Sequence, residues 1–122
     1  MTLRSVHADF SWVVVVTNAL VGAWAVGAHY DTKLRRRALW WATIAAETTI
    51  VVQVALGVAL VSIKHEEVAQ FHAFYGFVAL ATVGIIYSYR QQVRPHLFLL
   101  YGLGGLFLMG LGLRAIAISP IP

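Results

Sequence analysis

The stretch Gln70-Phe71-His72-Ala73-Phe74-Tyr75-Gly76 begins a long apolar run, and it is the segment that decides the predicted fold. A second histidine, His7, stands at the start of another apolar run near the N-terminus. These two runs are the first and the third of four, so in an up-down bundle the two helices are parallel. The sequence therefore predicts that His7 and His72 lie at the same end of the bundle.

Composition places the chain in a membrane. Of its 122 residues, 60% are hydrophobic and only 11% are charged, whereas a soluble domain is about half apolar and about a quarter charged. The absence of cysteine excludes disulfides, thiolate metal sites and iron–sulfur clusters. The net charge of +4 comes from basic residues in short loops between apolar runs, which is typical of membrane topology. We therefore expect contact with a lipid bilayer and no binding of nucleic acid.

The apolar runs predict four membrane-spanning helices, at about residues 8–28, 38–63, 71–89 and 97–119. The first run alone would extend about 32 Å at about 1.5 Å per residue, which is enough to cross a hydrocarbon core of about 30 Å. Short loops make neighbouring helices antiparallel. The predicted fold class is an all-α integral membrane protein, a four-transmembrane-helix up-down bundle formed by residues 1–122 as a single domain.

Positive charge predicts the orientation. The loops after the first and third runs hold six Lys and Arg residues, and the opposite side holds three. The first set is Lys33, Arg35, Arg36, Arg37, Arg90 and Arg94, and the second is Arg4, Lys64 and Arg114. The side with more positive charge is expected in the cytoplasm, so both termini are predicted to be extracytoplasmic in the cell membrane. A cleaved signal peptide ending near Ala28 is the rival interpretation, but the basic cluster that follows favours a membrane span.

Two polar residues lie near the middle of the apolar runs. Glu47 is roughly 14 Å from the inner end of its predicted helix, and Asn18 lies at a similar depth. An intramembrane carboxylate is costly and therefore indicates a functional site by default. Three interpretations stay open: a protonated Glu47 that bonds Asn18 or a backbone carbonyl, a proton or quinone role, and contact with a partner subunit.

The fourth run is rich in glycine. Gly105 and Gly112 are seven residues apart and share a helical face, and Gly102 lies one turn before Gly105. Small residues let helices approach closely in lipid. These glycines either close the bundle or dock the chain onto another membrane subunit, for example of a respiratory complex.

The predicted pair of histidines suits a haem. Two neutral imidazoles on facing helices can ligate a haem iron from both sides. Gly76 lies one turn after His72 on the same face and would leave room for a flat macrocycle, which Phe74 and Tyr75 could pack. The alternative is that both histidines are polar-tipped anchors at the membrane interface.

Other polar residues near the membrane surfaces have predicted roles as well. Arg4, Lys64 and Arg114 are the basic groups that could meet haem propionates at the outer face. We expect His65 in a solvated turn, and His29 and His96 near lipid headgroups.

The order of these elements resembles one four-helix half of the haem A synthase family. The resemblance covers about residues 7–85 and rests on the helix led by His7, the element Gln53-Val54-Ala55-Leu56-Gly57, and the helix opened by His72. The family has two such halves, each with a histidine pair on the outer side and a Gln-x-x-Leu-Gly element between. The resemblance implies the four-helix scaffold and a haem b site formed by His7 and His72, with Gln53 beside it.

Several family features differ in this chain. It has one half, and it lacks the cysteine pair of an outer loop. Arg4 stands where the family's active half has a glutamate, three residues before its first histidine, and Ala8 stands where an arginine often follows. The oxidation of haem is therefore not expected.

Two functions remain. The first is a small cytochrome b-like electron-transfer or haem-handling protein. The second is a haem-free accessory subunit that stabilises a larger respiratory or transport complex through its fourth helix. The sequence contains no pattern typical of a nucleophile–base pair or a metal cluster, so we expect no catalytic activity of the chain's own.

Overall fold

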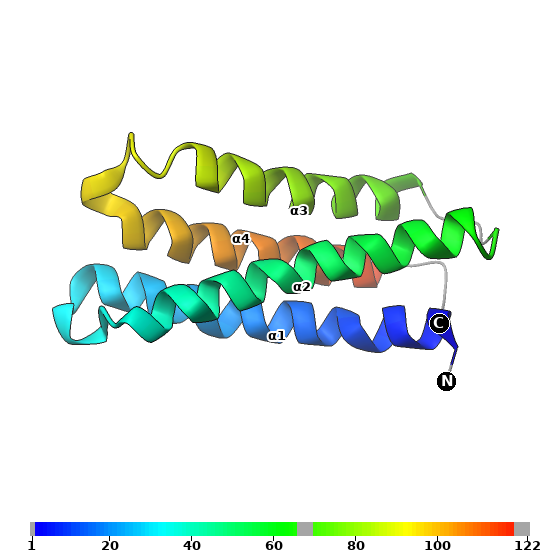
Figure 1. The fold of residues 1–122 in the computed structure, drawn as a ribbon, viewed down its shortest axis with the longest axis horizontal. Helices are drawn as coiled ribbons and strands as arrows, with labels where there is room; N and C mark the ends of the chain where they lie inside the picture. The colour runs from blue at the N-terminus through cyan, green and yellow to red at the C-terminus, as the bar shows by residue number, and fades with distance from the viewer. Residues whose placement is uncertain (1, 66–69, 119–122) are drawn as a thin grey trace.

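The structure is a computed structural model that describes residues 2–65 and 70–118, and it shows four long helices side by side (Figure 1). Their bounds are Leu3–Tyr30 for α1, Arg37–Ser62 for α2, Gln70–Ser88 for α3 and Leu97–Ala117 for α4. Two short 3-10 helices, η1 (Thr32–Leu34) and η2 (Arg94–His96), precede α2 and α4. Successive helices run in opposite directions, so α1 and α3 are parallel, and the predicted up-down bundle is confirmed.

All four helices are long and apolar enough to cross a membrane by length and composition. Large apolar side chains cover the outside of the bundle, among them Leu20, Phe71 and Leu103, which are 67%, 68% and 55% exposed. A continuous apolar exterior is stable in contact with lipid and not with water. The chain is thus a multi-pass membrane protein with four candidate spans, while the predicted orientation stays a prediction.

The first helix begins earlier than the sequence suggested. Thr2 and Ser5 cap it reciprocally: the Ser5 amide donates to Thr2 Oγ1 over 3.1 Å, and the Thr2 amide donates to Ser5 Oγ over 3.0 Å. Two N-terminal donors are satisfied in this way, so the helix starts at Leu3 rather than near residue 8. Consequently His7 lies within α1 and not ahead of it.

The other predicted bounds agree closely with the structure. Those of α2 and α3 are right to within one residue at each end, and α4 starts at Leu97 as predicted. The predicted end of the fourth run at Ser119 lies outside the described residues, and so do Glu66 and Glu67 of the predicted turn. His65 is exposed in that turn with a φ of 55°, so its predicted place there is confirmed.

The main seam of the bundle joins α1 to α4 through glycine. A Cβ on Gly22 of α1 would stand 2.9 Å from the Leu106 amide nitrogen, and one on Gly102 would stand 2.6 Å from the Val26 amide nitrogen. The two backbones are thus nearly in contact, as small residues allow in membranes. Gly105 also faces Gly22.

A third glycine of α4 packs on α1 in the same way. A Cβ on Gly112 would lie 3.0 Å from Val15 Cγ2. Of the two interpretations of Gly102, Gly105 and Gly112, the structure therefore supports bundle closure. Their helical face is covered by α1, so a partner subunit would have to contact other residues of α4.

The remaining two helices flank this seam. α2 packs mainly on α1 and α3 packs mainly on α4. A buried cluster of apolar side chains joins all four helices: Val14, Ile50, Ile86, Leu108 and Leu111. This arrangement places α1 and α3 across the bundle from each other, with the space between them available for a site.

Candidate functional site

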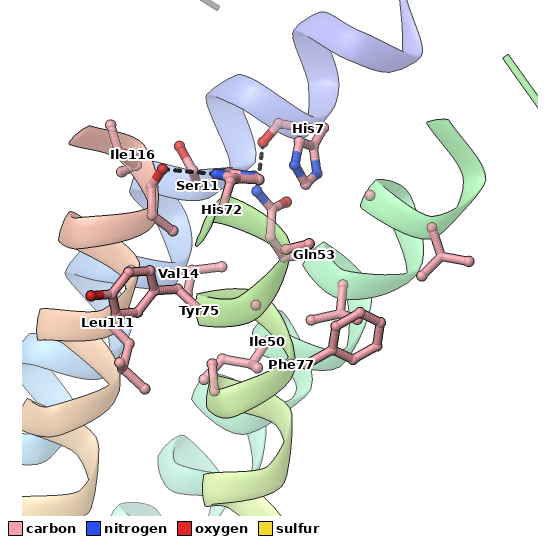
Figure 2. Close-up of a pocket in the computed structure, with 18 of the residues that line it drawn as sticks. His7, Ser11, Val14, Ile50, Gln53, His72, Tyr75, Phe77, Leu111 and Ile116 are labelled. Carbon is pink, nitrogen blue, oxygen red and sulfur yellow. Dashed lines mark hydrogen bonds between the residues drawn. The ribbon is translucent and has the colours of Figure 1, made fainter. Parts of the chain in front are cut away.

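A cavity of about 400 Å³ lies between the four helices, in the half of the bundle where α1 starts and α4 ends (Figure 2). Its wall is mostly apolar, with side chains such as Val14, Ile50 and Leu111. Polar groups gather at one end of it, where Figure 2 shows His7, His72 and Gln53 close together. A largely apolar cavity with a few convergent polar groups is typical of a ligand site.

His7 is held in the cavity by α2. The Gln53 side-chain amide donates from Nε2 to the main-chain oxygen of His7 over 2.7 Å. One turn further along α2, Gly57 faces the imidazole itself, since a Cβ there would lie 3.2 Å from His7 Cε1. Both residues thus position His7: Gln53 bonds its backbone, and Gly57 lies beside its ring.

This contact gives a physical meaning to two positions of the Gln-x-x-Leu-Gly element. The sequence named Gln53 as a site residue but did not assign any role to Gly57. Their spacing of four residues was the available signal, because positions i and i+4 share a helical face. The partner on α1 could not be read from that spacing.

His72 is fixed by α4. Its Nδ1 lies 2.8 Å from the main-chain oxygen of Ala115. Because a carbonyl only accepts, Nδ1 carries the proton in this hydrogen bond, so Nε2 would have its lone pair free in the neutral form of the ring. Histidines that ligate metals commonly donate their other N–H to a carbonyl in this way.

The two rings meet edge to face at this end of the cavity. Their centroids are 6.2 Å apart and their planes are inclined by 75°. The predicted meeting of His7 and His72 from two parallel helices is therefore observed. Each ring brings a nitrogen that can bind a metal to this end of the cavity.

Two buried polar atoms at the site have no hydrogen-bond partner among the described residues. They are His7 Nδ1 and Gln53 Oε1. Buried polar groups are normally paired, with protein or with water, because an unpaired one costs about 1–3 kcal/mol. Both atoms belong to residues that line the cavity, so a polar group or water held there would satisfy them.

The aromatic lining differs from the prediction at one position. Gly76 lines the cavity and a Cβ there would meet no atom within 4 Å, so the predicted open space beside His72 is present. Tyr75 lines the cavity, but Phe74 is 56% exposed and does not. Phe77 takes the place expected of Phe74, because residues 73 and 77 share a face that residue 74 does not.

The predicted basic groups are not all at the cavity. Arg4 is among the residues that line it. Arg114 is exposed near the end of α4 and Lys64 is exposed after α2, and neither lines the cavity. The structure thus brings Arg4 to the site, while a role of Arg114 in binding a cofactor stays a prediction without a contact to support it.

The two mid-membrane polar residues do not bond each other in the structure. Asn18 is 2% exposed, and its Nδ2 donates to the Val14 oxygen over 2.9 Å and to the Ala46 oxygen over 3.3 Å. Within the described part of the chain, no hydrogen bond joins Asn18 to Glu47. The expectation that Glu47 bonds Asn18 is therefore not met: Asn18 instead ties α1 to the backbone of α2, and Glu47 is half-buried on α2.

A second pair of histidines meets at the opposite end of the bundle. The ring centroids of His29 and His96 are 5.6 Å apart. Arg35 lies beside them and donates to the main-chain oxygens of Ala28 and His29, at the end of α1. His96 is exposed. The position of both histidines at an end of the bundle agrees with the prediction that they lie near lipid headgroups.

The metal-binding capacity of the site is that of two imidazoles. Within residues 2–65 and 70–118, no group of three or more His, Cys, Asp or Glu side chains is placed to hold a metal ion. Two protein ligands suit an iron that brings its other ligands with it, as haem iron does. Comparisons with protein-family models, curated proteins and solved structures find no match to this chain. The resemblance to haem A synthase stays a prediction.

Proposed function

We propose that this chain is a small cytochrome b-like membrane protein that binds haem b between His7 and His72 and serves in electron transfer or haem handling. The observation that carries the proposal is the 6.2 Å between the two ring centroids. A bond from an imidazole nitrogen to a metal is about 2.0 Å long, so two imidazoles on opposite sides of one metal have centroids about 6.3 Å apart. The observed separation is close to that value.

The hydrogen bond of the His72 ring also suits a metal ligand. Its Nδ1–H donates to the Ala115 oxygen, which leaves the Nε2 lone pair for a metal. This partner fixes the tautomer and the direction of the ring. A histidine that only anchors the helix at the membrane interface would point its ring to the headgroups and not to a carbonyl inside the bundle.

The unpartnered atoms of His7 and Gln53 are also consistent with a metal ligand at His7. An imidazole that ligates through Nε2 carries its proton on Nδ1, and an amide oxygen accepts a proton of that kind. His7 Nδ1 and Gln53 Oε1 are the two buried polar atoms found without a partner among the described residues. They are chemically complementary, and both are at the cavity.

The cavity suits the rest of a haem in size and chemistry. Its volume of about 400 Å³ lies in the range of about 300–1,000 Å³ that is usual for ligand and cofactor sites. Tyr75 and Phe77 supply aromatic surface, and Arg4 supplies a cation for a carboxylate. When bound, haem iron supplies reversible one-electron chemistry, which an electron-transfer role requires.

Titration of the purified apoprotein with haemin tests the proposal. We expect saturation at one haem per chain with a low-spin absorbance spectrum. His72→Ala should abolish this spectrum, and His7→Ala should abolish it or leave a high-spin species. His65→Ala and His96→Ala are matched controls at histidines outside the cavity, and both should leave the spectrum unchanged.

The opposite result would favour the accessory-subunit function. If haemin does not bind, or binds equally to the wild type and to both site variants, the proposal of a haem site at His7 and His72 is contradicted. The chain would then be a packing subunit. The complex with which it co-purifies in mild detergent would become the better guide to its function.

A further inference from the structure

The cavity around the histidine pair reaches the surface between α2 and α3, and also at the end of the bundle, where the lining residues Arg4 and Ser62 are exposed. Val58 and Val61 of α2 and Phe77 of α3 line the cavity, yet they are 47%, 42% and 59% exposed. A side chain that both lines a cavity and is exposed stands at its edge. Since α2 packs mainly on α1, and α3 mainly on α4, the seam between α2 and α3 is the natural place for an opening.

This opening, which we call the lateral mouth, lies along α2 and α3. Val58, Val61 and Phe77 belong to helices that are candidate spans. Their exposed surfaces are apolar, as surfaces in contact with acyl chains are. Gly76 stands beside the mouth on α3 and places no side chain in it, because a Cβ there would meet nothing within 4 Å.

The unpaired polar atoms of the site are buried, unlike the side chains at the mouth. His7 Nδ1 and Gln53 Oε1 are buried, and His72 is turned towards α4 by its bond to Ala115. A molecule that enters sideways would therefore meet apolar surface first and the ligating nitrogens last. That order suits an amphiphile that is already dissolved in the bilayer.

We propose that the ligand of the histidine pair enters from the lipid phase through the lateral mouth between α2 and α3. The inference rests on the proposed function in one respect, namely that the ligand is haem, an amphiphile that partitions into membranes. It adds the route of entry and predicts that an edge of the bound ligand touches lipid. Entry from the aqueous phase at the end of the bundle is the outcome that would contradict it.

The chain contains no cysteine, so single labels can be placed cleanly. We compare Val58→Cys with Val52→Cys, each labelled with a pyrene maleimide in lipid vesicles. Both valines are on α2 and exposed, at 47% and 40%, but Val52 does not line the cavity. Haem is then supplied from donor vesicles, and its uptake is followed by the Soret band.

The label at position 58 should slow uptake by on the order of tenfold, because it obstructs the mouth. The label at position 52 should leave the rate unchanged. Haem loaded before labelling should remain bound in both variants, which separates a blocked entrance from a damaged site. Equal uptake rates for the two labelled variants would overturn the proposed route.

A second measurement needs no haem. A nitroxide attached to the Val58→Cys variant should be relaxed by oxygen, which concentrates in lipid, and hardly at all by a water-soluble nickel chelate. Dominant relaxation by the nickel chelate would overturn the opening to lipid. If the unlabelled protein never takes up haem, the proposed function fails, and the nitroxide result still decides independently whether the mouth faces lipid.

Discussion

Gly57 of α2 lies so close to the imidazole of His7 that an added Cβ would stand 3.2 Å from His7 Cε1. Gln53, one turn earlier on α2, holds the backbone of the same histidine over 2.7 Å. One helix thus determines both the position of His7 and the space left to its ring. The geometry of the site therefore depends on this contact as much as on the two histidines.

Replacing Gly57 by alanine should weaken haem binding without unfolding the chain. The new methyl group would displace the ring of His7, and overpacking of this kind costs about 1–3 kcal/mol. That range corresponds to an affinity lower by about 5- to 150-fold, which a haemin titration measures. Gly84→Ala is the control, since a Cβ there meets nothing within 4 Å and Gly84 does not line the cavity. Equal affinities would show that Gly57 does not position His7.

The side chain of Asn18 should contribute to the stability of the bundle. The Asn18 side chain bonds the backbone of both α1 and α2. Asn18→Leu should therefore lower stability by about 0.6 kcal/mol and at most about 1.7 kcal/mol, which are the average and the largest value for hydrogen bonds between membrane helices. Thr48→Val is the control, because Thr48 bonds only Ile44 of its own helix.

Substitutions of Glu47 should have similar effects on stability whether or not they keep a hydrogen-bonding group. Because no hydrogen bond between Glu47 and Asn18 is seen among the described residues, Glu47→Gln and Glu47→Ala should differ little in detergent melting. A much less stable Glu47→Ala variant would indicate that the carboxyl group has a buried partner after all.

Alanine substitutions at two glycines of α4 should have different effects on stability. Gly102→Ala should destabilise the chain by about 1–3 kcal/mol or more, because its Cβ would lie 2.6 Å from a backbone nitrogen of α1 that cannot rotate away. Gly110→Ala is the matched substitution on the same helix, and its Cβ would meet nothing within 4 Å. Helix propensity predicts that it is neutral or stabilising by up to about 1 kcal/mol. Similar melting temperatures for the two variants would contradict the close α1–α4 seam.

The orientation can be tested by labelling. Cysteines placed at Thr2 and at Thr32 lie at opposite ends of α1 and should react oppositely with an impermeant thiol reagent. The excess of Lys and Arg after the first and third helices predicts labelling at position 2 in intact cells and at position 32 only after lysis. Labelling at position 32 alone in intact cells would move the histidine pair to the inner face.

The four helices and the meeting of His7 with His72 could be predicted because they depend on length and direction. Apolar runs long enough to span a bilayer define the helices, and two short loops make the first and third helices parallel. Rotation of each helix about its axis was harder to predict. In lipid the outside of a bundle is as apolar as its inside, so periodicity does not identify the buried face.

The wrong prediction at Phe74 follows from this missing information about how each helix is rotated. Phe74 was expected to pack the macrocycle, but Phe77 lines the cavity in its place. Arg114 is exposed and does not line the cavity, and its predicted role stays a prediction. The Ala115 oxygen that fixes His72 has no signal in the sequence, because every residue carries the same carbonyl group. The fit of Gly57 to His7 required knowing how α1 and α2 pack.

The most direct test of the central claim is an absorbance spectrum of the protein purified from haem-replete cells, recorded before and after reduction with dithionite. Ligation by His7 and His72 predicts a Soret band in the oxidised protein and sharp low-spin α and β bands on reduction, all of them lost in His72→Ala. A folded wild-type protein without a Soret band, or a spectrum that survives the His72→Ala substitution, would contradict the claim.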